Sequence, residues 1–415
     1  MNRTKGILVF LLWLIFQPGM RAQQASGPKS ADIKPSRPAE AESCVKTTDT
    51  LFPIREHSKY GYIDQTGQIV IPPKFDYVEN FREGMAVIAV GGKLMNIWDA
   101  NLEASPWAPG DVDHFGGKYG YIDTTGKIVV RPQYDWAGDF SEGLAPVAVG
   151  GKWISHKHRS GQLGYIDKTG KMVIPARYSY AGGFCGGLAA VAVGGKWERD
   201  ELVDEQYGYI DKNGQMAIPA QFRWAGNFFE GLAAVTRTAG ESECIDQAGQ
   251  IVNQPCGRFS DGLRRFVSGE HTSYLDRLTS RWVSTRKKGY IDRVGQIVIP
   301  VQYEGAGSFA EGLAPVMVGG QWGFIDKTGK AIIALQYDYA KEFSEGLAAV
   351  HVGTKWYVDA YSGGHWGYID KTGQLIIPAE FDNGETFTRG LAEVVAGHKW
   401  GYIDKSGKYV WQATN

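Results

Sequence analysis

The sequence predicts an all-β protein, built as a tandem array of nine three-stranded antiparallel β units. The first observation is a tetrapeptide that recurs along most of the chain, and a fixed repeat of this kind determines architecture before any local pattern does. The second is composition, with 55 glycines in 415 residues and 13% aromatic residues. The third is that no apolar helical period runs far enough to indicate a helix. The tetrapeptide is GYID, or a degraded form of it, at Gly61–Asp64, Gly120–Asp123, Gly164–Asp167, Gly208–Asp211, Glu243–Asp246, Gly289–Asp292, Gly323–Asp326, Gly367–Asp370 and Gly401–Asp404.

One well-preserved unit shows the expected strands. Leu313 and Leu347 begin consecutive units, 34 residues apart. The strand candidates 313–318, 322–326 and 330–334 are rich in β-branched and aromatic residues and are bounded by glycine. A Gly-Gly turn joins the first two strands, and an Asp-Lys-Thr-Gly turn joins the next two, with the Asp side chain accepting a backbone N–H. The linker from Leu335 leads to the next unit.

The motifs of this unit resemble the WG-containing repeat family, also called the KWG repeat. The resemblance lies in WGFID at Trp322 and WGYID at Trp366 and Trp400, with the D-x-T-G-x-x-I-I-P hairpins and F-x-E-G-L-A linkers. It covers about residues 51 to 412, although other units carry Tyr60, Tyr119, Tyr207 or Leu163 in place of the Trp. The resemblance implies a β-rich repeat that mediates interactions and supplies no catalytic residues.

The ends of the array bear on whether it is open or closed. The first unit begins with its own strand at Leu51–Glu56, and the last ends with its own third strand at Tyr409–Trp411. Circular propellers often close by sharing one sheet between the two termini, and that device is absent here. The sequence therefore favours an open, solenoid-like array, with a closed, propeller-like ring as the alternative.

Insertions distinguish the units from one another. The distance from the end of the first strand to the Gly of GYID is five residues in a short unit such as Val318 to Gly323. It is longer in units 2, 3, 4, 6 and 8, and in three of these the excess is ten residues. An even excess leaves strand register intact, which indicates extended hairpins projecting from one edge of the array. The five distances run from Val90 to Gly120, Val149 to Gly164, Val193 to Gly208, Ser268 to Gly289 and Val352 to Gly367.

The inserted hairpins differ in charge and aromatic content, so the sequence predicts that partner specificity resides in them. Trp98 and Trp107 of the second unit, Trp282 of the sixth and Tyr361 of the eighth are the candidate binding residues. Trp, Tyr and Arg are enriched at interface hot spots. The alternative is that neighbouring hairpins merely pack on one another, as the basic third and acidic fourth hairpins would suit.

The fifth unit contains two of the four cysteines. Cys244 replaces the Tyr of GYID, and Cys256 follows the third strand of the same shortened unit. Two such substitutions in one eroded unit predict a disulfide that compensates for lost packing. Cys44 and Cys185 are far apart in the sequence, and the sequence leaves open whether they pair.

The N-terminal segment has the pattern of an export signal. Arg3 and Lys5 precede the apolar run Ile7–Phe16, which is too short to span a bilayer, and Ala22 offers a cleavage point. We expect a signal peptide over residues 1–22, a flexible linker over 23–50 and the repeat array over 51–415. The array would then lie in the periplasm or outside the cell.

No pattern of catalytic, cofactor or metal-binding residues is evident. The aspartates of the repeated turns each offer one carboxylate, whereas calcium needs six to eight oxygens. The linker glutamates, such as Glu83 and Glu142, recur at equivalent positions and so have a structural role. His156 and His158 would face one side of a strand, but no third ligand accompanies them.

These patterns predict an exported, non-enzymatic scaffold that binds a protein partner through a rim of inserted hairpins. The alternative is a module that binds a glycan or a cell-wall polymer through exposed aromatic residues. A net charge of −1 argues against nucleic acid or an anionic membrane as the partner. Exposed motif aromatics would favour the glycan, and buried ones the scaffold.

Overall fold

The computed structural model describes residues 50–414 apart from 96–112, 152, 156–157, 160, 199–200, 238–241, 269–272, 277–280, 285, 354, 358–359 and 398. The chain divides into two units, residues 1–38 and 39–415, and all described residues belong to the second. Every regular element among the described residues is a β-strand.

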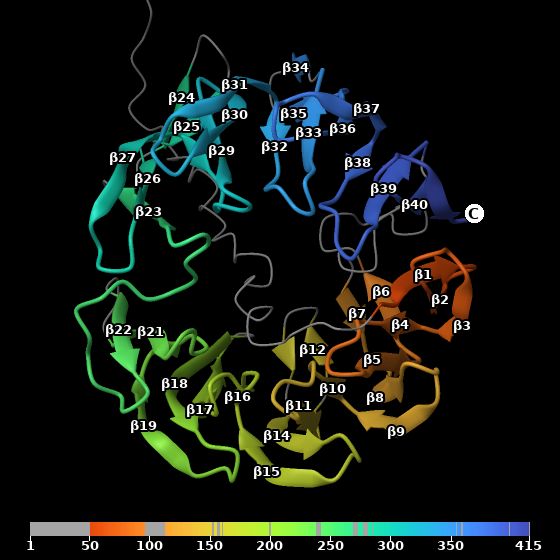
Figure 1. The fold of residues 1–415 in the computed structure, drawn as a ribbon. Helices are drawn as coiled ribbons and strands as arrows, with labels where there is room; N and C mark the ends of the chain where they lie inside the picture. The colour runs from red at the N-terminus through yellow and green to blue at the C-terminus, as the bar shows by residue number, and fades with distance from the viewer. Residues whose placement is uncertain are drawn as a thin grey trace, which may run out of the picture. The chain divides into compact units, whose positions relative to one another are not determined.

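Nine antiparallel sheets of the repeat region follow one another around a ring, and we number them blades 1 to 9 in chain order (Figure 1). In blades 2, 3, 4, 7, 8 and 9, four strands pair in the order innermost, second, third and outer. Blades 1 and 6 lack a described innermost strand, and blade 5 lacks a described outer strand.

The strands of each class occupy equivalent places in the repeat. The innermost strands are β4 (Tyr77–Val78), β10 (Trp136–Ala137), β16 (Tyr180–Ala181), β20 (Trp224–Ala225), β28 (Gly305–Ala306), β32 (Tyr339–Ala340) and β38 (Asn383–Gly384). The second strands are β1 (Phe52–Glu56), β5 (Met85–Val90), β11 (Leu144–Val149), β17 (Ala189–Glu198), β21 (Leu232–Thr236), β23 (Arg264–Ser268), β29 (Leu313–Val318), β33 (Ala348–Val352) and β39 (Ala392–Ala396).

The remaining two classes contain the repeated tetrapeptide and the strand that follows it. The third strands are β2 (Lys59–Ile63), β8 (Lys118–Asp123), β14 (Gln162–Asp167), β18 (Glu201–Ile210), β22 (Ser242–Asp246), β26 (Lys287–Ile291), β30 (Gln321–Asp326), β36 (His365–Ile369) and β40 (Lys399–Ile403). The outer strands are β3 (Ile69–Phe75), β9 (Ile128–Tyr134), β15 (Met172–Tyr178), β19 (Met216–Phe222), β27 (Ile297–Tyr303), β31 (Ala331–Tyr337), β37 (Leu375–Phe381) and β41 (Tyr409–Gln412).

The innermost strands correct the expectation of three strands per unit. The linker between units was expected to connect them and to contribute core side chains without forming a strand, but two of its residues join the next sheet as a fourth strand. Trp136 pairs with Ala148 and Ala137 pairs with Val147 in this way. Two residues are too few for a period-2 pattern, and therefore the sequence alone did not indicate a strand there.

The repeated turn and the repeated glycine have clear local causes. In the turn after β8, Asp123 Oδ1 accepts hydrogen bonds from Thr125 N at 3.0 Å, Lys127 N at 3.1 Å and Thr125 Oγ1 at 2.6 Å. Gly126 takes the positive φ that closes this turn. In β30, a Cβ on Gly323 would lie 2.6 Å from Ile333 O of the outer strand, so only glycine lets the two backbones approach this closely.

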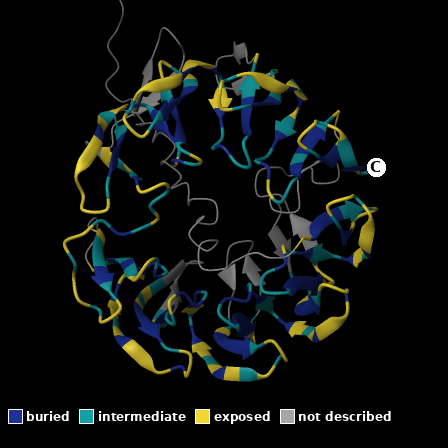
Figure 2. Ribbon diagram, in the orientation of Figure 1, coloured by how far each residue is buried: buried dark blue, intermediate teal, exposed yellow. Residues whose placement is uncertain are grey.

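The hydrophobic core lies between neighbouring blades, because each sheet has a blade packed on both of its faces. Figure 2 shows buried residues on the strands inside the ring and exposed residues along the outer strands. Between blades 2 and 3, Tyr121 packs on Phe140 with ring centroids 4.8 Å apart, and its hydroxyl donates to Gly138 O at 2.7 Å. Equivalent hydroxyl-to-carbonyl bonds are made by Tyr62, Tyr165, Tyr209, Tyr290, Tyr368 and Tyr402.

The array closes on itself, so the predicted open solenoid is wrong and the closed ring is correct. Blade 9 packs directly on blade 1 through one core that includes Phe52, Ile54, Trp400 and Tyr402. The Tyr402 hydroxyl donates to Pro53 O at 3.0 Å across 349 residues of sequence. No sheet is shared between the two ends of the described chain; the closure consists of side-chain contacts. The sequence inference favoured the open array because the ends share no unit, and this ring closes without sharing a sheet.

Candidate functional site

The inserted hairpins all leave their blades at the same end of the sheet. The second strand of each blade leads into the insertion, and the third strand returns from it, so the five insertions lie on one face of the ring, the insertion face. Four of them form separate two-stranded sheets, and in blade 4 the strands β17 and β18, of ten residues each, themselves extend into the hairpin. The separate pairs are β6 (Lys93–Met95) with β7 (Asp113–Phe115), β12 (Trp153–Ser155) with β13 (His158–Arg159), β24 (Ser273–Asp276) with β25 (Arg281–Ser284), and β34 (Lys355–Tyr357) with β35 (Ala360–Ser362).

The side chains of the predicted binding residues all lie outside the described part of the chain. Trp98 and Trp107 lie outside the described residues, as does His156. Trp282 lies in β25 and Tyr361 lies in β35, but their side chains are also outside the described part of the chain. Their roles stay predictions.

Carboxylates anchor the base of several hairpins. Asp76 Oδ2 accepts the backbone N–H of Gly91 at 2.7 Å, and Asp135 Oδ2 accepts that of Gly151 at 2.8 Å. Lys118 Nζ also lies 2.5 Å from Asp135 Oδ1. Each carboxylate lies at the start of an innermost strand, so it fixes the hairpin of its own blade to the inner part of the sheet.

A second set of residues on this side of the ring was missed by the sequence interpretation. The first residue of the innermost strand is aromatic in five blades, at Tyr77, Trp136, Tyr180, Trp224 and Tyr339. Among the residues whose burial is described, the exposed aromatic side chains are three of these, Tyr180 at 42%, Trp224 at 45% and Tyr339 at 47%. We call these five residues the inner aromatic row. The signal that could have revealed them is the recurring aromatic before Ala in the linkers.

The surroundings of Tyr339 show how a member of the row is held. Its ring lies 5.0 Å from Trp322 of the preceding blade and 5.8 Å from Trp366 of its own blade. Lys341 Nζ lies 5.0 Å from the Trp366 ring, and His351 lies against the same ring at 5.3 Å. Burial lowers the pKa of His351, which favours the neutral form of this imidazole.

The repeated aromatics of the GYID strands are buried. Tyr62, Tyr121, Tyr165, Tyr209, Tyr290 and Tyr368 have no exposed surface, and Trp400 is 5% exposed. These rings therefore form the core between blades and are not available to stack on a ligand.

The opposite face carries the Asp turns and the linker glutamates, which make repeated contacts between blades. Glu142 accepts the backbone N–H of Gly186 at 2.7 Å and pairs with Lys212 Nζ at 3.0 Å. Glu345 does the same with Gly390 N and Lys405 Nζ. Arg389 occupies the glutamate position at the closure of the ring, where a hollow of about 470 Å³ is lined by Gln65, Glu345, Arg389, Gly390, Leu391 and Asp404.

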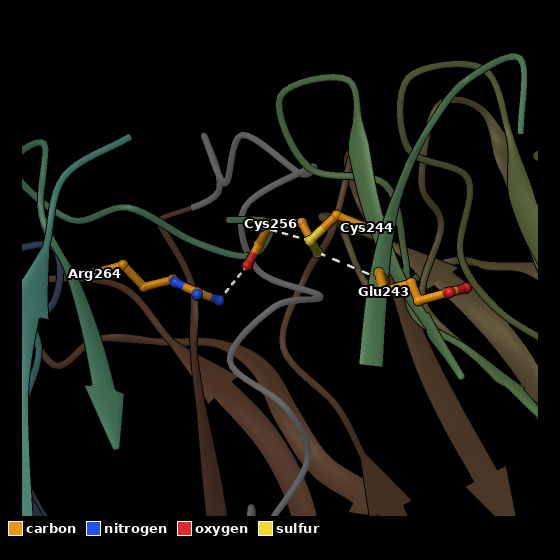
Figure 3. Close-up of a disulfide and its surroundings, with 4 residues drawn as sticks. All are labelled: Glu243, Cys244, Cys256 and Arg264. Atoms are coloured by element: carbon orange, nitrogen blue, oxygen red, sulfur yellow. Dashed lines mark hydrogen bonds between the residues drawn. A yellow bond between two sulfur atoms is a disulfide. The ribbon is translucent and has the colours of Figure 1, made fainter. Parts of the chain in front are cut away.

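The structure contains a disulfide between Cys244 and Cys256, with their Cα atoms 5.5 Å apart (Figure 3). Aligned on the following Phe-Ser-Asp-Gly, Cys256 stands where Ala137 stands in an ordinary linker. Arg264 donates from Nη1 to Cys256 O. Cys244 stands where Tyr121 stands, so the disulfide links the third strand to the linker one residue before the glycine position that accepts the tyrosine hydroxyl elsewhere. Cys185 is also disulfide-bonded, whereas Cys44 lies outside the described residues.

No metal-binding group of three or more His, Cys, Asp or Glu side chains occurs in the part of the chain that the structure describes. The same part contains no helix long and apolar enough to cross a membrane.

The closed ring of small, radially arranged antiparallel sheets defines a β-propeller with nine blades. The chain belongs to the WG-containing repeat family, because the model of that repeat matches seven segments that together span more than half of the sequence. These segments are residues 60–93, 119–153, 164–197, 207–237, 289–322, 322–356 and 366–399. The resemblance inferred from the sequence is thereby confirmed.

Comparison with solved structures finds similarities at low sequence identity. A eukaryotic initiation factor is similar with a TM-score of 0.51 and 11% identity, over 88% of this chain and 96% of that one. BamB from Moraxella catarrhalis has a TM-score of 0.32 and 13% identity, over 79% and 89% of the two chains. Dipeptidyl peptidase 4 from Porphyromonas gingivalis has a TM-score of 0.37 and 10% identity, over 82% and 53%. No curated protein matches the sequence.

Proposed function

We propose that this protein is an exported, non-enzymatic propeller scaffold that binds a protein partner through its insertion face. The observation that carries the proposal is the asymmetry between the two faces. On the opposite face the described residues repeat the same turn and ion-pair contacts from blade to blade. On the insertion face the five hairpins differ in length, charge and aromatic content, so only this face can distinguish one partner from another.

Export rests on the N-terminal sequence, with its basic residues, short apolar run and cleavage point. A disulfide is also the kind of bond that persists in an oxidising compartment. Fractionation of the cell of origin tests this part, and we expect the mature chain in the periplasm or the medium. Its recovery from the cytoplasm with free thiols would contradict the proposal.

Trimming the hairpins tests the binding surface. Blade 7 gives the template, because Val318 and Gln321 pair directly across a Gly-Gly turn. In blade 8, Val352 pairs with His365, so residues 353–364 can be replaced by Gly-Gly without altering the sheet. Ser268 pairs with Lys287 in blade 6, so residues 269–286 can be replaced in the same way.

The mature protein, immobilised, would first capture its partner from envelope extract, and the purified partner would then be titrated against each variant. We expect the blade 6 and blade 8 variants to bind about 30-fold more weakly, as the loss of an anchor residue such as Trp282 or Tyr361 costs about 2 kcal/mol. Lys212→Ala, on the opposite face, is the matched control and should bind normally. Native affinity in all trimmed variants would refute the proposal.

A second candidate, binding of a glycan or cell-wall polymer, is favoured by one observation. The motif aromatics are buried, but Tyr180, Trp224 and Tyr339 of the inner aromatic row are exposed and could stack on sugar rings. Sedimentation with purified wall polymer tests this candidate. If it is correct, the triple alanine variant at these positions should lose binding that the hairpin-trimmed variants retain.

A further inference from the structure

Cys185 forms a disulfide whose partner follows from the other cysteines of the chain. The sequence contains four cysteines, and Cys244 and Cys256 bond to each other. Cys185 is itself disulfide-bonded, and no cysteine in the described part of the chain is free. Cys44, which lies outside the described residues, is therefore the cysteine that remains to pair with it.

Cys185 replaces a serine that joins neighbouring blades elsewhere. The equivalent Ser141 donates from its hydroxyl to Phe184 O at 2.5 Å, and the equivalent Ser344 donates to Phe387 O at 2.6 Å. The backbone of the turn is unchanged in blade 4, because Cys185 N still donates to Leu188 O at 2.9 Å. The fold of the linker therefore accepts a cysteine here but does not itself call for one.

The residue after Cys185 also departs from the repeat. The linker into blade 4 has Gly186 at the position where the other seven linkers carry a charged residue. Gln247 of the next blade donates to Gly186 O at 2.9 Å in place of the usual contact with a carboxylate. The linker that contains Cys185 thus lacks the charged link of the others, and its distinctive link is the disulfide. The seven charged residues are Glu83, Glu142, Glu230, Asp261, Glu311, Glu345 and Arg389.

Cys185 lies at the inner edge of the ring, on the face opposite the insertions. It belongs to the turn that joins the innermost strand β16 to the second strand β17. All second strands run toward the insertion face, so the start of β1 at Phe52 lies on this same opposite face. The chain before Leu51 therefore begins on the face where Cys185 lies, three blades away around the ring.

The length of chain between Cys44 and blade 1 fits this separation. Three steps around the ring, at the usual spacing of about 10 Å between packed sheets, amount to about 30 Å along the arc, and the distance straight across is shorter. Seven residues from Cys44 to Leu51 reach about 23–25 Å when extended, and the two Cα atoms of a disulfide add about 5.5 Å. The segment is long enough to cross the opposite face, with little slack.

We propose that Cys44 and Cys185 form a disulfide that holds the segment before blade 1 as a covalent strap across the opposite face, from blade 1 to blade 4. Two thiols lose two protons and two electrons to an oxidising disulfide, which is reduced to two thiols, and one S–S bond forms by exchange. The strap fixes the N-terminal end of the mature chain on the opposite face and leaves the insertion face accessible to a partner.

The bond forms in the cell only in an oxidising compartment, so its presence there rests on the export proposed above. The purified mature chain, oxidised with glutathione disulfide, tests the pairing separately from export. Mass spectrometry of a non-reduced digest should recover one peptide pair that contains Cys44 and Cys185. Recovery of Cys185 as a free thiol, or a disulfide-linked dimer in non-reducing electrophoresis, would overturn the proposal.

Tryptic cleavage after Lys46 tests whether the segment is a strap, because Lys46 lies between Cys44 and Leu51. We expect cleavage in the wild type to be at least about tenfold slower than in Cys44→Ser, since a segment held at both ends is a poor protease substrate. Any cleaved N-terminal fragment should stay attached to the wild-type ring until a reductant is added.

Cys185→Ser is the matched variant, because it restores the serine of the ordinary linkers and leaves the fold intact. It should be cleaved after Lys46 as fast as Cys44→Ser. The double variant should be cleaved no faster than either single variant, because all three lack the same bond. Equal cleavage rates in the wild type and in both single variants would show that the segment is not held as a strap.

Discussion

The junction that closes the ring and an ordinary junction both link neighbouring blades through a tyrosine hydroxyl, but the hydroxyl bonds to a different backbone carbonyl in each. Between blades 2 and 3, the Tyr121 hydroxyl donates to Gly138 O, and Gly138 N in turn donates to Pro146 O at 2.9 Å. Blade 1 has no described innermost strand to supply a residue equivalent to Gly138. At this junction the Tyr402 hydroxyl therefore bonds directly to Pro53 O, the equivalent of Pro146 O.

The closing junction also reverses a charge. In most linkers a glutamate stands just before the glycine that leads into the second strand, and it accepts a backbone N–H from the glycine of the next linker. In blade 9 this position is occupied by Arg389. No linker precedes blade 1 in the described chain, so that donor has no equivalent. Arg389 instead lies 4.6 Å from the centre of the Phe52 ring and donates to Leu51 O at 3.4 Å.

The junction between blades 5 and 6 shows a third solution. Blade 5 has lost its outer strand, and the following linker is too short to form an innermost strand for blade 6. The disulfide between Cys244 and Cys256 takes the place of the tyrosine contact. At each of these three junctions a residue of the third strand is linked to the next blade in the ring. The link is a hydrogen bond to one of two different carbonyls or a disulfide, so its chemistry differs from junction to junction.

The largest effect is expected from removing the disulfide. Cys244→Ser with Cys256→Ser should lower the free energy of unfolding by about 3 kcal/mol, because the bond closes a short loop in the unfolded chain. Thermal unfolding monitored by circular dichroism measures the change, and mass spectrometry of a non-reduced digest should recover the linked peptides. Cys244→Tyr with Cys256→Ala restores the ordinary residues and should lose less. An unchanged midpoint for the serine variant would show that the link is not needed.

Restoring the glutamate at the closing junction should destabilise the ring. Arg389→Glu removes the cation–π contact with Phe52 and the hydrogen bond to Leu51 O, with an expected cost of about 2 kcal/mol. Arg389→Lys keeps the positive charge and serves as the control, with a smaller loss. If Arg389→Glu melts like the wild type in thermal denaturation, the charge reversal has no part in closure.

Removing one tyrosine hydroxyl separates the closing junction from an ordinary one. Tyr402→Phe leaves the buried Pro53 O without this donor and should cost about 1–2 kcal/mol. Tyr121→Phe takes the donor from Gly138 O instead and should cost less, because the innermost strand of blade 3 still holds Gly138 in place through its N–H bond to Pro146 O. Phe324 already occupies this position in blade 7, so the ring itself fits. Equal losses in chemical denaturation would mean that the two junctions do not differ energetically.

The smallest effect is expected at the Asp turns and depends on pH. In blade 2, hydrogen bonds from the Thr125 hydroxyl and nearby backbone N–H groups lower the pKa of Asp123, so the folded state favours its ionised form. This stabilisation is complete above the unfolded pKa of about 3.9 and is lost as the pH falls through the lower folded pKa.

Blade 5 offers the matched variant, since Ala248 stands where Thr125 stands. Ala248→Thr should raise the melting temperature by less than about 2 °C at pH 7 and by less still at pH 3. A gain of the same size at both pH values would exclude the carboxylate as its source.

Much of the fold followed from the repeat. The nine units, the Asp turns and the burial of the GYID aromatics all arise within one unit or between it and the next, so local patterns reveal them. The two-residue innermost strands were not foreseen, because these residues form a strand only by pairing with the second strand of their blade. The inner aromatic row was missed for the same reason.

The sequence by itself determined the composition of each unit and the places where units differ, including Cys244, Cys256 and the five insertions. These features depend on interactions within about 34 residues, where turn chemistry and side-chain alternation act. Only the tertiary structure decided that the array closes, because closure depends on the small rotation between successive blades summed over nine of them. That sum brings Tyr402 to Pro53 across 349 residues, a contact that no local pattern encodes.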